Sequence, residues 1–356
     1  MARSTRGAGL IKDLYIDDWD EIDRFIATAW GPEHPLRDRG LFLWQHSGSA
    51  ATSQSGIATA AIADDQIVGL RGLQHLSFQI YPDNNGLQVV KGCAAPFMHV
   101  LKRYRGVLGL KLYRHNLAVH PVNLFLGANK QTSLRLHQGT GYQIYDDLPR
   151  FGLRVGENTP KRIVAAADQM IDPAFLADVW TRFSDCYKPF SILRTEAFFR
   201  WRYANAPFWQ YRMLQSPQED AVLVYRIEPV THRGNNEGSA LRILELFCDP
   251  HTCTESRLNE FLDGVISFAA AKNCQYIDHF QTMRPLQESL LNAGFTRISH
   301  ESGTFPVLFN PLNYEKPPIN YGWKLSPELQ SQMKEQNFAH YVVKSDSDQD
   351  RPTPRS

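Results

Sequence analysis

Apolar residues recur at helical spacing in some segments of the chain and alternate with polar residues in others. In the segment 17–30 apolar residues occupy one face, acidic residues fill the first turn and an aspartate can cap the start, which predicts an amphipathic helix. The runs 57–63 and 66–70, joined by Asp64 and Asp65, predict a hairpin. Further helices are predicted at 35–46, 173–183, 194–203, from the capping signature 252–255 onward and at 285–292, and further strands at 87–90, 144–155, 162–166, 210–214, 221–227, 242–248 and 276–280.

The stretch 97–142 organises the rest of the chain. It predicts a strand, a turn at 102–109 rich in basic residues and glycine, a helix to about Asn116, a second strand and a short second helix. A glycine turn between a strand and a helix N-terminus presents backbone N–H groups, and the helix dipole favours negative charge there. Arg103 and Arg105 add cationic side chains that pair well with phosphate. The turn is therefore predicted to bind an anion.

This stretch resembles the central motif of the GNAT superfamily of acyl-CoA-dependent N-acyltransferases. In that family an Arg/Gln-x-x-Gly-x-Gly/Ala turn binds the pyrophosphate of coenzyme A, and a helix one strand later ends in Tyr-x-x-x-Gly-Phe. The segment 103–108 matches the turn, with Leu108 at the last small position unless a shorter turn gives that place to Gly109. The segment 137–142 matches the helix end, with His137 in place of the tyrosine.

The resemblance implies which residues bind the co-substrate, acetyl-CoA or another acyl-CoA. The turn 105–109 cradles the phosphates. In the family the strand before the cradle splays from its neighbour and offers a backbone N–H to the thioester carbonyl, which implies a donor within 97–100. Asn129 matches a position that often binds the pantetheine arm. The coenzyme-binding residues implied are Val100, Arg103, Arg105, Gly106, Val107, Leu108, Gly109 and Asn129.

Amine attack on a thioester needs a base, a donor for the oxyanion and an acid for the leaving thiolate. By resemblance His137 stands at the position of the family's acid, and its alternative role is that of a surface histidine beside a turn. His99 lies on the splayed strand and can act as the base, because histidine titrates near neutral pH. The alternative for His99 is a hydrogen-bonded structural histidine. The catalytic candidates are thus His137 and His99.

The two halves of the chain repeat one order of elements. The segment 42–46 before the first hairpin matches 199–203 before the second, and 134–142 matches 286–295. We therefore expect an α/β fold of two tandem GNAT-like units, each a mixed, mostly antiparallel sheet flanked by helices, rather than two unrelated α/β domains. The predicted acyl-CoA-binding unit is 1–156. A degenerate unit without the glycine turn follows at 157–315, and then an extension at 316–356 that is expected to be disordered from about 345.

Composition and charge restrict the partners. The net charge of +1 gives no electrostatic case for nucleic acid, and no apolar run of about 18 residues predicts a membrane span. The five scattered cysteines contain no C-x-x-C pair, which favours a reducing compartment, the cytoplasm, over a disulfide framework or a structural zinc. The histidines lack the spacing of metal ligands, so no metal is expected.

The resemblance implies an enzyme that moves an acetyl or other acyl group from coenzyme A to a small-molecule amine. The tandem layout with one degenerate half is similar to the N-acyltransferases that act on nucleotide-linked amino sugars. Two alternatives stay open, because one fold carries many functions. One is transfer to another amine, such as an amino acid, a polyamine or a peptide. The other is a non-catalytic binding module of the same fold.

Overall fold

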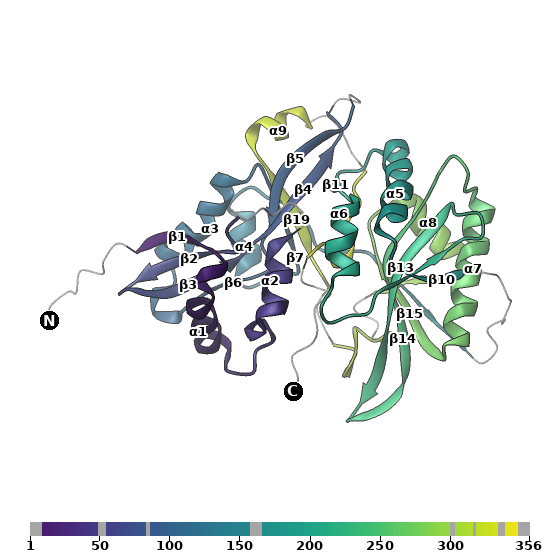
Figure 1. The fold of residues 1–356 in the computed structure, drawn as a ribbon, viewed down its shortest axis with the longest axis horizontal. Coiled ribbons are helices and arrows are strands. Elements are labelled where there is room, and N and C mark those ends of the chain that lie inside the picture. The colour runs from purple at the N-terminus through teal and green to yellow at the C-terminus, as the bar shows by residue number, and fades with distance from the viewer. Residues whose placement is uncertain are drawn as a thin grey trace.

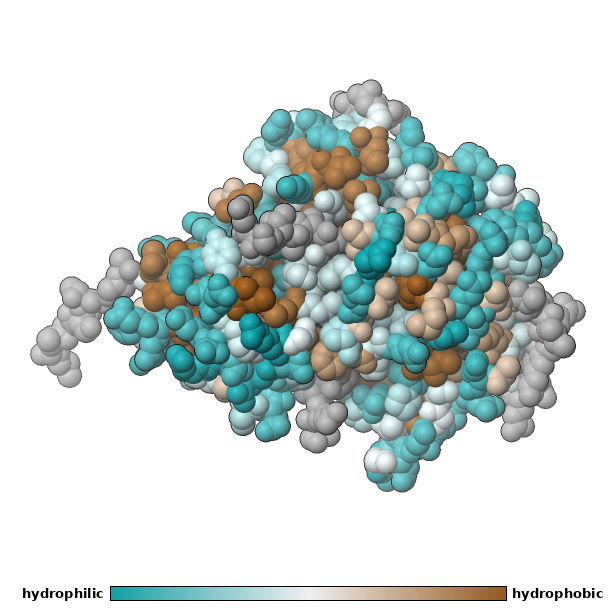
Figure 2. All heavy atoms as spheres, viewed as in Figure 1, coloured by the Kyte–Doolittle hydropathy of each residue, from teal (hydrophilic) through white to brown (hydrophobic). Residues whose placement is uncertain are grey.

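The computed structural model describes residues 9–48, 55–82, 86–156, 166–299, 303–315, 318–333 and 339–347. Two α/β lobes lie side by side, the N-terminal one in purple and blue and the other in teal and green, and the yellow C-terminal segment reaches both (Figure 1). Within these ranges no helix has the length and apolar character that a membrane crossing needs. On the face shown in Figure 2, apolar side chains gather in separate patches among hydrophilic ones.

A four-stranded sheet opens the first lobe, and its strands pair antiparallel in the order β1-β2-β3-β6. Helices α1 and α2 cover one face, where Ile22 and Phe42 pack with Leu70 as the apolar stripe of the sequence predicts. Helix α3 covers the other face, where Leu112 packs with Val100. The elements are β1 (Leu10–Leu14), α1 (Trp19–Trp30), α2 (Arg39–Ser47), β2 (Ala58–Ala63), β3 (Gln66–Gly72), β6 (Met98–Val100) and α3 (Val107–Val119).

A six-stranded sheet completes this lobe in the order β11-β4-β5-β7-β19-β8. Its elements are β4 (Gln74–Ile80), β5 (Gln88–Ala94), β7 (Val122–Leu126), α4 (Ser133–Gln138), β8 (Gln143–Tyr145), β11 (Ser191–Ile192), β19 (Tyr321–Leu325) and α9 (Pro327–Gln332). β5 pairs in parallel with β7 as far as Ala94 and Leu124. Beyond Ala94 the chain leaves β7, and β6 pairs with β3 of the other sheet. The strands on either side of α3 therefore splay apart.

The second lobe is built on a seven-stranded sheet in the order β10-β12-β13-β14-β15-β9-β16. Trp180 and Phe183 of α5 pack on Phe247 of β14 in the largest apolar core. Helix α7 begins after Thr254, whose hydroxyl caps it, rather than after Thr252. The elements are β9 (Arg150–Arg154), β10 (Ala167–Met170), α5 (Pro173–Tyr187), α6 (Glu196–Phe199), β12 (Arg212–Gln215), β13 (Ala221–His232), β14 (Asn235–Cys248), α7 (Glu255–Ala271), β15 (Cys274–Phe280), α8 (Arg284–Asn292), β16 (Thr296–Arg297), β17 (Leu308–Phe309) and β18 (Leu312–Asn313).

The sheets do not follow the unit boundaries predicted at 156 and 315. The segment 144–155, predicted as one strand of the first unit, forms two strands, and the second of them, β9, lies between β15 and β16 of the other lobe. In return β19, from the predicted extension, enters the first lobe between β7 and β8. Each lobe thus holds a strand from beyond its predicted boundary. The strand predicted at 162–166 lies outside the described residues.

Two hydrogen bonds between the halves support the internal repeat. The indole nitrogen of Trp44 donates to the carbonyl of Trp201 at 2.8 Å, and the indole nitrogen of Trp201 donates to the carbonyl of Trp44 at 2.8 Å. The two tryptophans occupy matching places in the segments 42–46 and 199–203. Such a reciprocal exchange is what a twofold relation between two like units produces.

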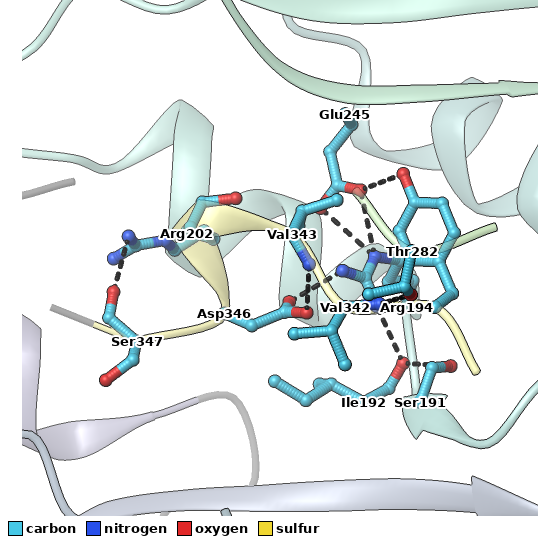
Figure 3. A network of polar contacts seen from close by, with 12 residues as sticks. Ser191, Ile192, Arg194, Arg202, Glu245, Thr282, Val342, Val343, Asp346 and Ser347 are labelled. Atoms are coloured by element: carbon cyan, nitrogen blue, oxygen red, sulfur yellow. Dashed lines mark hydrogen bonds and ion pairs between the residues drawn. The ribbon is translucent and has the colours of Figure 1, made fainter. Parts of the chain in front are cut away.

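The C-terminal segment 339–347 is anchored inside the second lobe (Figure 3). Arg194 donates from Nε to both carboxylate oxygens of Glu245 at 3.0 and 3.1 Å and from Nη2 to Asp346 at 2.6 Å. Arg202 donates to the carbonyl oxygen of Ser347 at 3.0 Å. The disorder predicted from about 345 is therefore wrong for Ser345 and the two residues after it, which are buried, while 348–356 lie outside the described residues.

Candidate active site

A cavity of about 530 Å³ lies where β6 and β7 splay apart. Its walls come from β6 and the residues before it, the N-terminal turns of α3, the end of β7 and helix α4, together with Arg71 of β3. This volume is within the range of small-molecule and cofactor sites. Among the described residues that line it are two arginines and two histidines, and neither aspartate nor glutamate. The only fixed charges on the described lining are therefore the positive charges of the two arginines.

The N-terminus of α3 forms one end of the cavity. Gly106 precedes the helix with φ 100° and ψ −121°, a backbone conformation that side chains rarely adopt, and no side chain caps the helix. The first backbone N–H groups of any helix lack an acceptor within the helix. Gly109 is buried and lines the cavity. The side chain of Leu108 instead lies against Gly9, the residue before β1. Gly109, rather than Leu108, thus provides the small residue at the cavity wall.

The basic residues of the turn divide into two groups. Arg105 lines the cavity, and its Nε donates to the carbonyl oxygen of Val100 at 3.1 Å. Arg103 lies over the ring of Tyr104, 4.6 Å from the centroid, and is not among the lining residues. Val107 is 75% exposed. The structure therefore places Arg105 at the cavity and Arg103 on the exposed outer side of the turn.

The backbone of β6 also faces the cavity. The N–H of Leu101 donates to the carbonyl of Val68 in β3 at 2.9 Å. Successive N–H groups of a strand point to opposite sides, so the N–H of Val100 points away from β3. The side away from β3 is the gap that β7 leaves open. Val100 thus offers a backbone donor to a ligand between the strands.

His137 lies on α4 at the other end of the cavity and is 7% exposed. Its Nδ1 lies 2.7 Å from the hydroxyl oxygen of Tyr113, and its ring stacks on Phe125 with 4.1 Å between centroids. Burial, and next the positive charge of Arg71, lower the pKa of His137 to about 3. At this pKa the imidazole is neutral at physiological pH, a form that donates a hydrogen bond to a leaving thiolate rather than a full proton.

This lowered pKa predicts a specific loss of stability in acid. Above pH 6.5 His137 is neutral in the folded and unfolded chain, so it contributes nothing to the pH dependence. Below pH 6.5 only the unfolded chain takes up the proton, until the pH approaches the folded pKa of about 3. At pH 5.0 this difference amounts to about 2 kcal/mol of unfolding free energy.

Urea unfolding at pH 7.5 and pH 5.0 measures this effect. Between the two pH values His137→Gln is expected to lose about 2 kcal/mol less than the wild type. His251→Gln, at an exposed position far along the chain, serves as the control and is expected to behave as the wild type does. Equal losses in all three proteins would show that His137 is not held neutral by the fold.

His99 lies on β6 and also lines the cavity. Its ring packs edge to face against Trp30 and Phe25 of α1, at centroid distances of 5.0 and 6.3 Å. Burial, and next the charge of Arg105, lower the pKa of His99 below its ordinary value. A neutral imidazole is the form that can accept a proton.

Asn129 lies outside the cavity wall, between β7 and α4. Its Oδ1 accepts hydrogen bonds from the backbone N–H groups of Gln131 and Thr132 at 2.9 and 3.2 Å. The side chain therefore shapes its own turn, and the predicted contact of Asn129 with coenzyme A stays a prediction. The neighbouring Ala128 and Thr132 line the cavity instead.

Among the lining residues that sequence reasoning missed, Arg71 and Tyr113 have the most direct contacts with the predicted site. Arg71 is 2% exposed and donates from Nη1 to the carbonyl oxygen of Tyr113 at 3.0 Å. A signal for Arg71 was available, because a charged residue interrupts the apolar run 67–73 of a predicted strand. Nothing in the local pattern distinguishes Tyr113 from other apolar-face residues of α3. In the described ranges, no group of three or more His, Cys, Asp or Glu is arranged to hold a metal ion.

No family model and no curated protein matches the sequence. Solved structures nevertheless share its fold. A GCN5-related N-acetyltransferase from Kribbella flavida aligns with a TM-score of 0.56 at 13% identity, over 91% of this chain and 72% of that one. A probable N-acyltransferase from Enterococcus faecalis aligns with 0.56 at 12% identity, over 92% and 74%. N-myristoyltransferase of Saccharomyces cerevisiae with bound myristoyl-CoA aligns with 0.53 at 8% identity, over 92% and 80%.

These neighbours cover about nine-tenths of this chain, so the shared fold spans both lobes. At such identities the likeness concerns the fold alone. It confirms the predicted fold class, two tandem GNAT-like units of mixed α/β structure.

Proposed function

We propose that this protein transfers an acyl group from coenzyme A to an amine. The observation that carries the proposal is the cavity between the splayed strands β6 and β7. It leads from an uncapped helix N-terminus with Arg105 beside it to the pair of Tyr113 and His137. Structures of the same fold include N-acetyltransferases and an N-myristoyltransferase with bound myristoyl-CoA.

The phosphates of the co-substrate bind at the start of α3. Backbone N–H groups of 106–109 and the guanidinium of Arg105 are the donors, since unpaired N–H groups and the helix dipole both favour an anion there. Arg103 reaches the same phosphates if it leaves the ring of Tyr104. The backbone N–H of Val100 donates to the thioester carbonyl, where negative charge develops during attack.

Proton transfers follow from the neutral histidines. The amine nitrogen forms a bond to the thioester carbon, and His99 accepts the proton that the nitrogen releases. The carbon–sulfur bond then breaks and the thiolate takes up a proton. In the tautomer with its proton on Nε2, His137 accepts the hydrogen bond of Tyr113 at Nδ1 and donates an Nε2–H hydrogen bond that stabilises the leaving sulfur. The proton that the thiolate takes up is the one that His99 accepted from the amine.

The charge of the cavity lining indicates which charge a favourable acceptor carries. Its described lining holds Arg71 and Arg105 and lacks carboxylates, which disfavours a polycationic acceptor such as a polyamine. An acceptor with negative charge fits better, and nucleotide-linked amino sugars and amino acids have this property. A nucleotide-linked amino sugar is therefore the first acceptor to test.

The test is a transfer assay that follows the release of free coenzyme A thiol. Purified protein with acetyl-CoA is offered nucleotide-linked amino sugars, amino acids, polyamines and a peptide with a free N-terminus. We expect thiol release that depends on one acceptor class, together with an acylated product of the matching mass. Binding of acetyl-CoA without transfer to any acceptor would instead support the non-catalytic binding module.

Replacing His99 tests its role as the base. His99→Gln is expected to lower kcat about a hundredfold with little change in the affinity for acetyl-CoA, since general base catalysis contributes on the order of 10²–10⁴. Rates are measured with the best acceptor of the panel from pH 5.5 to 9. His34→Gln, which replaces another histidine ring that packs on Trp30, is the matched control for packing. A wild-type rate in His99→Gln would remove His99 from the chemistry.

A further inference from the structure

Arg71 is a buried cation without a carboxylate partner in the described part of the chain. Its Nη1 bonds to the Tyr113 carbonyl, its guanidinium lies 4.6 Å from the centroid of the Tyr113 ring, and its Nε is buried without a hydrogen-bond partner. Burying a charge without an ionic partner is unfavourable, so proteins usually pair such groups.

Four other buried arginines of this protein follow that rule. Each is held by at least one aspartate or glutamate: Arg150 by Asp278, Arg194 by Glu245 and Asp346, Arg226 by Glu228, and Arg242 by Asp278 and Glu228. Arg202 is also buried and has no such ion pair among the described residues, but it donates to the carbonyl oxygen of Ser347 and does not line the cavity. Arg71 differs from all five because it lines the cavity. Arg71 therefore has two properties together: it lacks a carboxylate partner among the described residues, and it lines the cavity.

The position of Arg71 separates it from the phosphate cradle. Its hydrogen-bond partner Tyr113 is seven residues beyond Gly106 on α3, which corresponds to roughly 10 Å along the helix. At this depth Arg71 shares Tyr113 with His137, the residue assigned to the leaving thiolate. Arg71 therefore serves the reacting end of the cavity, where the acyl group and the acceptor meet.

The free part of the guanidinium indicates the chemistry of the missing anion. Nη1 is engaged by Tyr113, which leaves the edge formed by Nε and Nη2. Two parallel N–H groups on one edge match the two oxygens of a carboxylate. The protein covers Nε, so binding requires the guanidinium to turn this edge toward the cavity that it lines.

We propose that Arg71 binds a carboxylate carried by one of the substrates, either at the end of the acyl group or on the acceptor. The proposal rests on the function proposed above and narrows its substrate class. An acyl group that ends in a carboxylate, as in succinyl-CoA, places its charge beyond the thioester, at the reacting end. An amino acid places its carboxylate next to the attacking nitrogen. Both sources present the same group to Arg71.

The donor arm of the test uses calorimetry with coenzyme A, butyryl-CoA and succinyl-CoA. The last two have acyl chains of four carbons and differ in the terminal carboxylate. We expect the wild type to bind succinyl-CoA about tenfold to a hundredfold more tightly than butyryl-CoA, which is the range for hydrogen bonds to charged groups. In Arg71→Gln this preference disappears, while the affinity for coenzyme A stays within about twofold.

The acceptor arm uses acetyl-CoA with glycine and with methylamine, which lacks the carboxylate. A preference of at least tenfold in kcat/KM for glycine that Arg71→Gln loses assigns the carboxylate to the acceptor. Arg71→Lys keeps the charge without the two-pronged edge and is expected to keep only part of the preference in either arm. Arg114→Gln changes an exposed arginine of α3, next to Tyr113 in the sequence; this variant is the matched control and keeps all of the preference.

Thermal unfolding first shows that Arg71→Gln is folded, and its Tm is expected to equal or exceed that of the wild type because an unpaired buried charge is removed. Coenzyme A binding with no carboxylate preference in either arm would overturn the proposal for Arg71 alone. A preference that survives in Arg71→Gln would do the same. If the wild type binds none of the three coenzyme A species, the proposed function fails as well.

Discussion

Gly106→Glu is expected to weaken the binding of acetyl-CoA about a thousandfold. Gly106 has φ 100° directly before α3, where a side chain forces the backbone into another conformation and turns the N–H groups of 106–109 away from the phosphates. Two or more charge-assisted hydrogen bonds are lost, each contributing about 1.5–3 kcal/mol. The new carboxylate also repels the phosphates at the helix N-terminus. Calorimetry with acetyl-CoA measures the change.

Gly234→Glu is the matched control for this substitution. Gly234 lies in the exposed turn between β13 and β14 with φ 83°, and, like Gly106, it has no atom within 4 Å of an added Cβ. The two variants thus bear the same side chain on a similarly strained backbone, but in different lobes. Wild-type affinity is expected in Gly234→Glu. If both variants bind acetyl-CoA like the wild type, the start of α3 is not the phosphate site.

Arg194→Met is expected to lower the free energy of unfolding by about 3–5 kcal/mol, the usual effect of removing one partner from a buried ionic group. Arg194 is fully buried and joins β14, through Glu245, to the C-terminal segment, through Asp346 (Figure 3). Without it two buried carboxylates lose their shared cation and repel each other. Urea unfolding at pH 7.5 measures the loss.

Arg284→Met is the control for the same change of side chain. Arg284 pairs with Glu288 on α8, where both side chains are more than 60% exposed. An exposed pair at this spacing contributes about 0.3–0.5 kcal/mol, so the variant is expected to unfold almost as the wild type does. A loss of less than about 1 kcal/mol in Arg194→Met would mean that the buried network does not hold the C-terminal segment in place.

The parts of this fold that the sequence predicts well are local. The capping and apolar spacing of α1 and the hairpin of β2 and β3 are expressed within a few neighbouring residues. The glycine turn before α3 is likewise visible, because a positive φ at Gly106 needs glycine. The internal repeat was also visible in the sequence, and the structure shows the same hydrogen bond at both helix ends. The backbone N–H of Tyr142 donates to the carbonyl of His137 at 3.3 Å, and the backbone N–H of Phe295 donates to the carbonyl of Leu290 at 3.0 Å.

The parts that the sequence does not predict depend on distant partners. Nothing near β9 indicates that it pairs with β15, more than 120 residues later, and nothing near β19 indicates its place beside β7. The lowered pKa of His137 on α4 also depends on distant partners, since it results from burial and from the charge of Arg71 on β3. Spacing along the chain predicts the cradle, whereas the reacting end of the cavity is assembled by tertiary contacts.

The place of β19 has a consequence for synthesis of the protein. This strand lies between β7 and β8, so the first lobe has a gap in its sheet until residue 325 has left the ribosome. Domains usually fold as units from the N-terminus during translation. Here the lobe that carries the cavity is synthesised first but completed only after most of the second lobe has been made, with an exposed edge on β7 in the meantime. Nascent chains that stop before residue 321 therefore present an unfinished edge, a ready target for chaperones and for aggregation.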